Sequence, residues 1–392
     1  EKHFHNVLCL SKAKGMDINM KILFMIPTLS VGGAEKVLVN LANFLNKQQF
    51  NVTIMTLFEG GVNKQFLNNN VKYISCFKHQ IRGNSHILKL FSPQRLYAAL
   101  VKKKYDIIVS YLEGPTARIV SGCPYEKCKL VSWIHCTMHN KKEFAVGFRN
   151  YNEAKSSYEK YDRCIFVSKE VQDSFLKFCK RNNGNEVLYN TNNSAQIIEL
   201  SNQPLDDSRF TDNKTFKICA AGKVIPVKGF DRLARIHKTL INAGYNIQTF
   251  ILGIGAQEEE IKRYIQKNEL ENTFHFMGYQ TNPYKYIRSS DLFVCSSFSE
   301  GFSTAVTEAL IVGTPVITTN VSGMKELLGD SEYGLITDNN EAALYEGIRY
   351  LLDNPSILNE YRIKAAVRGE DFKSENTVRN VEKMFLDLLE EK

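Results

Sequence analysis

Two glutamates, Glu300 and Glu308, are separated by seven residues, and a glycine directly follows the first of them. Carboxylates accept hydrogen bonds from sugar hydroxyls, while backbone N–H groups and a cation can hold phosphates. The pair could therefore bind a ligand that contains both a sugar and a diphosphate. The alternative is that Glu308 is an exposed helix residue and that Glu300 is a charge favoured by the helix dipole.

The glutamates lie in a predicted strand–turn–helix unit. The apolar run 292–295 predicts a strand, and a helix is expected to begin near Ser303 or Thr304, which are good N-cap residues. It ends at Gly313, with a proline and a second apolar strand beyond. Gly301 would let the backbone approach a ligand closely. In such a unit the helix N-terminus directs N–H groups to the carboxyl edge of the sheet, where an anion can bind.

Two lysines could supply the cation. Lys223 and Lys228 lie in a turn that contains glycine and proline, after an apolar run at 216–221 that predicts a strand. A helix is expected after the turn, so this is a second strand–turn–helix unit. Exposed turn charges are the alternative interpretation of both lysines.

A glycine turn and two polar side chains follow predicted strands in the first half of the chain. Gly32 and Gly33 come after the first apolar run, in an arrangement that suits a phosphate or simply makes a tight turn. His135 stands at the end of the strand expected at 130–134, and Glu113 follows another strand. A lone histidine is more often structural than catalytic. Because ligands of open α/β sheets bind at strand carboxyl ends, both side chains are candidates.

Apolar runs alternate with helical stretches along the chain, which predicts parallel, doubly wound α/β sheets. A length of 392 residues favours two domains. The polar run from 190 to about 215 has the composition of an interdomain linker. We expect a leader outside the fold at 1–19, a first domain at 20–195, a second domain at 196–376 and a final helix at 377–392.

Charge divides the chain into two unequal parts. The formal net charge is +8, but residues 1–205 contain 28 Lys and Arg against 15 Asp and Glu, a net +13, so the remainder has a net −5. Basic surface can bind nucleic acid or anionic lipid. No nucleic-acid motif or base-stacking aromatic array is present. An anionic membrane surface or a phosphate-bearing acceptor is therefore the expected partner, and nucleic acid is not.

The nine cysteines show no metal or disulfide pattern. None has C-x₂-C spacing, and an odd count argues against a full disulfide set. Reduced thiols are typical of a cytosolic protein. No apolar run approaches the ~18 residues that indicate a membrane span.

One predicted helix combines an apolar face with a basic end. Ser92 suits its N-cap, and Leu96 and Tyr97 belong to its apolar face. Arg95 and Lys102–Lys104 add positive charge. The helix could rest on a membrane surface, or it could pack on the sheet as a crossover helix with a solvated basic end. Both interpretations hold if only the basic end meets lipid.

The segment that begins at Glu300 reads E-G-F-S-x₄-E-A-L-x₂-G-x-P-V-I. It resembles the E-x₇-E signature of retaining glycosyltransferases of family 4, and the resemblance extends from about Lys21 to the C-terminus. It implies the GT-B fold, in which two Rossmann-like, doubly wound parallel-sheet domains face a central cleft. It also implies a bacterial enzyme of cell-surface polysaccharide or glycolipid assembly.

The resemblance implies a role for each matching residue. Glu300 would face the transferred sugar, Glu308 the ribose of the donor nucleotide, and His135 the reacting sugar. Lys228 and Lys223 would clamp the diphosphate. The family pattern commonly has arginine at the position of Lys223. Lysine keeps the positive charge here but lacks the bidentate fork of a guanidinium. Further donor contacts would come from the turn after Glu300, the N-terminal glycine loop and the turn that reads the base: Gly301, Phe302, Ser303, Thr304, Gly32, Gly33, Gly278 and Tyr279.

The implied reaction transfers a hexosyl or N-acetylhexosaminyl group with retention. Its donor would be a nucleotide diphosphate sugar, most simply a UDP-sugar, and its acceptor a lipid-linked or polysaccharide molecule such as a capsule precursor. Protein cations in the place of an ion imply that neither metal nor cofactor is required. The expected location is the cytoplasmic side of the cell membrane, with peripheral attachment. A sugar-nucleotide epimerase of the same fold and an inactive sugar-nucleotide-binding protein are the alternatives.

Overall fold

The computed structural model describes residues 19–391 except 31, 80–83, 182 and 213, and the chain forms two compact units. Unit 1 runs to Phe166 and includes Gln172–Leu188 and the segment from Val378, whereas unit 2 contains Val167–Val171 and Tyr189–Thr377. The leader expected at 1–19 lies outside the described residues apart from its last one.

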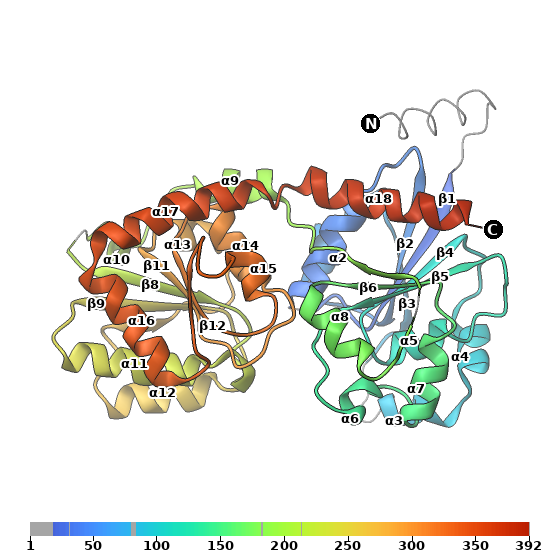
Figure 1. The fold of residues 1–392 in the computed structure, drawn as a ribbon, viewed down its shortest axis with the longest axis horizontal. Coiled ribbons are helices and arrows are strands. Elements are labelled where there is room, and N and C mark those ends of the chain that lie inside the picture. Colours follow the sequence, from blue (N-terminus) through green and yellow to red (C-terminus); the bar gives the residue numbers. More distant parts are fainter. Residues whose placement is uncertain (1–18, 31, 80–83, 182, 213, 392) are drawn as a thin grey trace. The chain divides into compact units, whose positions relative to one another are not determined.

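Unit 1 is built on a seven-stranded parallel sheet in the order β3-β2-β1-β4-β5-β6-β7 (Figure 1). Its central strands are continuous apolar runs, as expected for strands covered on both faces. The strands are β1 (Met20–Ile26), β2 (Phe50–Phe58), β3 (Lys72–Phe77), β4 (Ile107–Tyr111), β5 (Lys129–Ile134), β6 (Arg163–Phe166) and β7 (Asn185–Val187). Its helical segments are α2 (Gly33–Phe44), η1 (Val62–Phe66), α3 (Asn84–Leu90), α4 (Pro93–Leu100), α5 (Pro115–Val120), α6 (Lys141–Phe144) and α7 (Tyr151–Tyr158), and α8 (Lys169–Leu176) is divided between the units.

Unit 2 is built on a six-stranded parallel sheet in the order β10-β9-β8-β11-β12-β13. Figure 1 shows α11, α12 and α16 on one face of this sheet and α9, α13, α14 and α17 on the other. The strands are β8 (Phe216–Ala221), β9 (Ile247–Leu252), β10 (Phe274–Phe276), β11 (Leu292–Cys295), β12 (Val316–Thr319) and β13 (Leu335–Thr337). The helical segments are α9 (Ser194–Ser201), α10 (Ser208–Thr211), η2 (Pro226–Lys228), α11 (Phe230–Asn242), α12 (Glu258–Lys267), α13 (Tyr284–Arg288), α14 (Thr304–Ile311), α15 (Met324–Leu328), α16 (Glu341–Asp353) and α17 (Pro355–Glu370).

The strand order of both units confirms the doubly wound α/β class. In each sheet the chain winds outward on one side of the first strand and then returns to its other side. Neighbouring strands β1 and β4, and likewise β8 and β11, are therefore followed by loops that diverge. Such a switch point is where open α/β sheets bind ligands.

Residues 190–201 are not the linker that their polar composition predicted. Asn190 and Asn192 are buried within unit 2, and Asn190 Nδ2 donates a hydrogen bond to the carbonyl of Phe302 at 3.2 Å. Asn193 caps α9 by accepting from the backbone N–H of Gln196 at 3.0 Å. Polar composition was misleading because buried polar side chains are tolerated when they are hydrogen-bonded.

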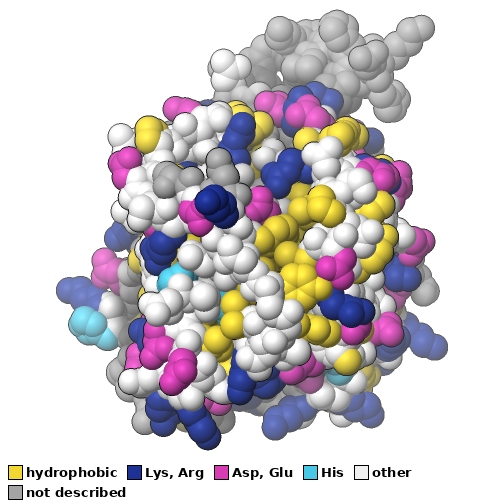
Figure 2. All heavy atoms as spheres, turned by 90° about the vertical axis from the view of Figure 1, so that its left-hand side faces the viewer, with side chains coloured by type: hydrophobic (Ala, Val, Ile, Leu, Met, Phe, Trp, Pro, Cys, Tyr) yellow, Lys and Arg dark blue, Asp and Glu magenta, His cyan; other side chains and the backbone are white. Residues whose placement is uncertain are grey.

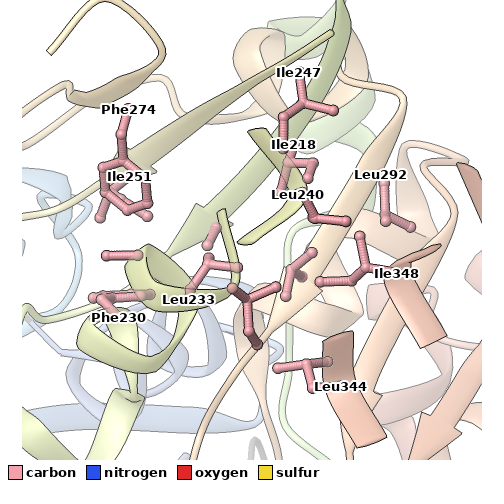
Figure 3. Close-up of a cluster of buried hydrophobic side chains, with 14 of the residues drawn as sticks. Ile218, Phe230, Leu233, Leu240, Ile247, Ile251, Phe274, Leu292, Leu344 and Ile348 are labelled. Carbon is pink, nitrogen blue, oxygen red and sulfur yellow. The ribbon is translucent and has the colours of Figure 1, made fainter. Parts of the chain in front are cut away.

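The core of unit 2 lies between the sheet and α11, α12 and α16 (Figure 3). Apolar residues recur along α11 with helical spacing, so that one face of this helix is buried against β8 and β9. Leu344 and Ile348 of α16 close the cluster on the side of β11 and β12. This packing fixes the start of α11, directly after the turn that carries Lys223 and Lys228.

The last helix, α18 (Ser374–Glu390), takes the end of the chain back to unit 1. Phe385 packs edge-on against Phe24 of β1 and Phe50 of β2, with ring centroids 6.1 and 6.0 Å apart. Glu382 accepts a hydrogen bond from the backbone N–H of Asn46 at 2.7 Å. These contacts anchor the residues from Val378 onwards to the first sheet.

Candidate functional site

The loops after β8 and β11 meet at the switch point of unit 2. Gly229, in the first loop, has a φ of 64°, and a Cβ there would lie 2.2 Å from the carbonyl oxygen of Ser296 in the second. Only glycine allows both the left-handed backbone and this approach. Two segments that are distant in the sequence are thereby brought into contact at the carboxyl edge of the sheet.

Lys228 and Glu300 form an ion pair at this junction. Lys228 Nζ lies 2.6 Å from Glu300 Oε1 and 2.8 Å from Oε2, and Ser297 Oγ donates to Oε1 at 2.6 Å. The two charged side chains are 25% and 10% exposed, respectively, so solvent screens them only in part. The structure therefore brings together the cation and the carboxylate that the sequence proposed for phosphate and sugar.

The start of α14 lies directly after this pair. Ser303 is its N-cap and accepts a hydrogen bond from the backbone N–H of Val306 at 3.4 Å. The other N–H groups of the first turn, which begins at Thr304, have no partner within the helix and suit an anion. Glu308 is only 5% exposed, so the alternative that it is an exposed helix residue is wrong.

The two lysines of the β8 turn have different environments. Lys228 is half-buried and paired, so it is not an exposed turn charge, whereas Lys223 is exposed. A Cβ on Gly222 would lie 3.7 Å from Lys228 Cε. Lys223 thus remains available to a ligand without being held at Glu300.

The ends of β8, β9 and β10 are also in contact. A Cβ on Gly253 would lie 1.9 Å from the carbonyl oxygen of Gly222, so glycine is required where these loops touch. The backbone N–H of Gly253 donates to the carbonyl of Gly278 at 2.8 Å. Tyr279 is half-buried beside it. The turn at Gly278, which was assigned to the nucleotide base, is therefore connected through Gly253 to the turn that carries the two lysines.

Phe302, between the two glutamates, is buried rather than open to solvent. Its ring stacks on Tyr189 with centroids 5.0 Å apart and contacts Phe372 edge-on. Gly301 before it approaches Gly323 so closely that a Cβ at Gly323 would lie 2.5 Å from the Gly301 carbonyl. Phe302 therefore anchors the turn through its side chain.

Unit 1 carries the candidate histidine at the carboxyl end of β5. Glu113 Oε2 accepts a hydrogen bond from the backbone N–H of His135 at 3.0 Å, so these two predicted residues are neighbours. The imidazole packs on Tyr111 with centroids 4.8 Å apart, and within the described part of the chain its Nε2 is buried without a partner. Burial lowers the pKa of His135 to about 3, so the ring is neutral at physiological pH. His139 is exposed and is not part of this group.

The N-terminal glycine loop leads into α2. Gly32 is the N-cap and Gly33 the first residue of that helix. The carboxylate of Glu35 covers the loop, since a Cβ on Gly32 would lie 2.1 Å from Glu35 Oε2. Ser30 Oγ donates to the same carboxylate at 3.3 Å. The carboxylate of Glu35 therefore lies against the start of this helix in the structure.

Two residues that build the site were missed from the sequence. Ser297 orients Glu300, and Arg232 on α11 donates to the backbone of the turn that contains Ser297. The helical spacing of α11 could have indicated Arg232, because it falls on the face that buries Leu233 and Ile236. Among the described residues, no group of three or more His, Cys, Asp or Glu side chains could hold a metal ion.

Two family models match this chain. Residues 31–191 match the model described as Glycosyltransferase Family 4, and residues 201–368 match the model described as Glycosyl transferases group 1. A relative from Campylobacter jejuni is named N-acetylgalactosamine-N,N'-diacetylbacillosaminyl-diphospho-undecaprenol 4-alpha-N-acetylgalactosaminyltransferase. It is 26% identical over 375 residues, which cover 93% of this chain and 99% of the relative.

Solved structures with the same fold cover nearly the whole chain. HepE from Anabaena, in complex with UDP and glucose, has a TM-score of 0.74 at 16% identity and covers 94% of this chain and 100% of its own. TarM from S. aureus, in complex with Fondaparinux, alpha-GlcNAc-glycerol and UDP, has a TM-score of 0.73 at 15% identity and covers 95% and 100%. At these identities the likeness concerns the fold, and it confirms the two-unit architecture expected from the sequence.

Proposed function

Because the chain belongs to the family 4 glycosyltransferases of the GT-B fold, we propose that it transfers a hexosyl or N-acetylhexosaminyl group with retention from a UDP-sugar to a lipid-linked or polysaccharide acceptor. The C. jejuni relative is named for an acceptor carried on diphospho-undecaprenol. UDP is bound in the HepE and TarM structures. These names support the donor and acceptor classes, and bacterial cell-surface glycan assembly is the proposed setting.

The observation that carries the proposal is the Lys228–Glu300 pair beside the start of α14. A nucleotide diphosphate sugar presents phosphate oxygens and sugar hydroxyls a few ångströms apart, and this junction of two loops brings together a cation, helix N–H groups and a carboxylate. It lies at the switch point of a doubly wound sheet. Glu308, buried one helical turn further on, is assigned to the ribose hydroxyls.

Opposite charges develop on the two parts of the donor during the proposed reaction. As the bond between the anomeric carbon and the diphosphate oxygen breaks, negative charge grows on the diphosphate and positive charge on the sugar. Lys228, Lys223 and the first N–H groups of α14 stabilise the negative charge. Glu300 holds the sugar hydroxyls and stabilises the positive charge. The acceptor hydroxyl forms the new bond on the face that the diphosphate leaves, and its proton passes to the departing diphosphate oxygen.

His135 has a different role in this proposal. Because its pKa is about 3, the imidazole is a neutral hydrogen-bonding group and not a general acid. Its unpartnered Nε2 can bond to a sugar hydroxyl, and Glu113 holds the backbone that carries it. We therefore assign His135 to sugar orientation.

A panel of nucleotide sugars tests the proposed function. Each donor is incubated with the protein, with and without undecaprenyl-diphosphate-linked glycan acceptors, and UDP release and products are measured. Transfer with retained anomeric configuration supports the proposal. An epimerised nucleotide sugar without UDP release would identify an isomerase, and donor binding without any product would identify an inactive binding protein.

Metal independence is a separate prediction. Full activity is expected in the presence of excess EDTA, because lysines and helix N–H groups neutralise the departing diphosphate in place of an ion. Initial rates are measured after chelation and again after addition of Mg²⁺ or Mn²⁺. Loss of turnover in EDTA that either ion restores would contradict the prediction.

The membrane partner is proposed from the surface of unit 1. No helix in the described part of the chain is long and apolar enough to cross a membrane. Leu96 and Tyr97 of α4 are buried, so the crossover interpretation is correct for the apolar side of this helix. Arg95 and Lys102–Lys104 are exposed at its two ends. The basic end therefore remains available to lipid headgroups.

Exposed apolar side chains adjoin the start of α4. Leu90 is 75% exposed, and Ile87 and Phe91 are exposed as well. The backbone beneath them is fixed, because Arg149 donates to the carbonyl of Leu90 at 3.0 Å and Arg118 to that of Phe91 at 2.6 Å. A fixed helix end with exposed apolar side chains beside cations suits the interface of an anionic bilayer.

The face of unit 2 shown in Figure 2 carries charges of both signs and is not predominantly basic. On the face of unit 2 shown in Figure 2, Lys and Arg side chains are interspersed with Asp and Glu side chains around a band of hydrophobic ones. This mixture agrees with the net −5 of residues 206–392. We therefore place the lipid contact on unit 1 alone.

Vesicle binding is predicted to be reversible and salt-sensitive. Changing Lys102, Lys103 and Lys104 together to glutamine should weaken binding to phosphatidylglycerol vesicles at least about tenfold at low salt, because each cation near such a surface adds to the attraction. This electrostatic attraction decays within ~10 Å at ordinary salt. Donor hydrolysis should be unchanged, since none of these three lysines is assigned to the donor. Sedimentation with vesicles gives the measurement.

A matched triple variant controls for net charge. Lys262, Lys364 and Lys373 lie on unit 2, and changing them to glutamine removes the same charge from a different surface. This control should bind vesicles almost as the unchanged protein does. The membrane proposal fails if no binding occurs at low salt, or if both triple variants bind equally.

A further inference from the structure

Arg232 is a buried cation that forms no ion pair within the described part of the chain. It lies on α11 and is only 1% exposed. Burying a guanidinium is costly unless its N–H groups are hydrogen-bonded. Arg235, one turn later on the same helix, is paired instead with Asp231 and Glu341 and remains partly exposed. The contacts of Arg232 therefore need a reason other than surface charge pairing.

The guanidinium of Arg232 is directed at one turn of the chain. Nη2 donates to the carbonyl oxygen of Ser296 and, at 3.1 Å, to that of Ser297. Its centre lies 4.0 Å from the ring centroid of Phe298, and Nη1 donates to Asn339 Oδ1 at 3.0 Å. A planar fork that holds successive carbonyls fixes a backbone more tightly than a single ammonium can.

The turn held by Arg232 carries two hydroxyls that donate hydrogen bonds to the two charged residues of the site, Lys228 and Glu300. Ser297 Oγ donates to Glu300 Oε1 at 2.6 Å. Ser296 Oγ donates to the backbone carbonyl of Lys228 at 2.9 Å. Ser297 thus links the buried guanidinium to the carboxylate, because its carbonyl accepts from Arg232 and its hydroxyl donates to Glu300.

We propose that Arg232 is a positioning residue, whose guanidinium fixes the 296–298 turn so that Ser297 holds Glu300 in the orientation needed for sugar transfer. The inference rests on the proposed role of Glu300. Arg232 itself contacts neither donor nor acceptor in this proposal. Its effect reaches the reaction only through the turn, and small misplacements of reacting groups have large effects on rate.

The turn should survive the loss of Arg232, which makes the proposal testable. Thr319 Oγ1 still donates to the Ser297 carbonyl at 2.6 Å, and Asn339 Nδ2 to the Phe298 carbonyl at 3.1 Å. Methionine is long enough to fill most of the space of the arginine stem. Arg232→Met is therefore expected to fold, with Arg235→Met as the matched control on the same helix.

The kinetic expectations separate positioning from folding. With the fastest donor of the nucleotide-sugar panel, Arg232→Met should lower kcat about tenfold, and Arg232→Lys should recover part of the loss. UDP affinity should stay within about threefold, because UDP lacks the transferred sugar that Glu300 is proposed to hold. Arg235→Met should match the unchanged protein in both measurements. A general folding defect would instead lower UDP binding and the active fraction together.

A double-mutant cycle with Ser297→Ala gives the decisive comparison. Ser297→Ala alone should lower kcat about tenfold, because a hydrogen bond to a charged group is lost. If Arg232 acts through Ser297, the double variant should also lose only about tenfold, instead of the 100-fold expected for independent effects. Independent losses, or unchanged kcat in Arg232→Met, would overturn the inference. The proposed function has a separate test, namely turnover by the unchanged protein and loss of turnover in Glu300→Gln. Failure of the Arg232 inference would therefore leave the proposed function intact.

Discussion

Replacing Glu300 by glutamine is expected to lower kcat by about 10²–10³-fold without unfolding the protein, as for lost electrostatic stabilisation of a transition state. The amide has the shape of the carboxylate and can still accept from Ser297 Oγ, which now lies 2.6 Å from Oε1. It cannot stabilise the positive charge that grows on the sugar. Initial rates of transfer and a thermal melt provide the measurement.

UDP affinity distinguishes this result from damage to the donor site. Glu300→Gln should retain UDP binding or strengthen it, because the ammonium of Lys228 no longer shares its charge with a carboxylate. Glu271→Gln serves as the control, since Glu271 is exposed before the amino end of β10. Near-normal turnover in Glu300→Gln would remove the carboxylate from the mechanism.

Replacing Lys228 by alanine is expected to reduce kcat/KM at least about 30-fold, which corresponds to a transition-state loss of at least ~2 kcal/mol. The departing diphosphate loses its nearest cation. UDP affinity should fall as well, which is the opposite of the expectation for Glu300→Gln. The free energy of unfolding should change by about 1 kcal/mol or less, because Glu300 keeps its bond from Ser297 and the pair is partly screened.

Lys223→Ala is the matched control for Lys228→Ala. Lys223 is exposed in the same turn and is not held at Glu300, so its loss should reduce kcat/KM by only a fraction of the Lys228 effect. Lys228→Arg should recover part of the activity because it restores the charge but not the compact ammonium. Unchanged turnover in Lys228→Ala would disprove the phosphate-clamp assignment.

Local features of the sequence predicted much of the fold. Strands β8 and β11 have the predicted limits, and the other predicted strands agree within a few residues, because apolar runs and cap residues act over short distances. Ser303 caps α14 as its side chain suggested. Most candidate residues could be found from the sequence because they lie in the segments that follow predicted strands, where α/β sheets place their ligands.

Only the tertiary structure decided which of these local units meet. Strand order depends on which apolar faces are buried together, and a sequence pattern does not specify that pairing. Hence the sequence proposed Lys228 and Glu300 separately, and the adjacency of β8 and β11 turned them into an ion pair. The burial of Arg232 and of Asn190 was likewise not evident from the sequence. Their hydrogen-bond partners, the carbonyls of Ser297 and Phe302, lie far away in the chain, and only the packed fold supplies them.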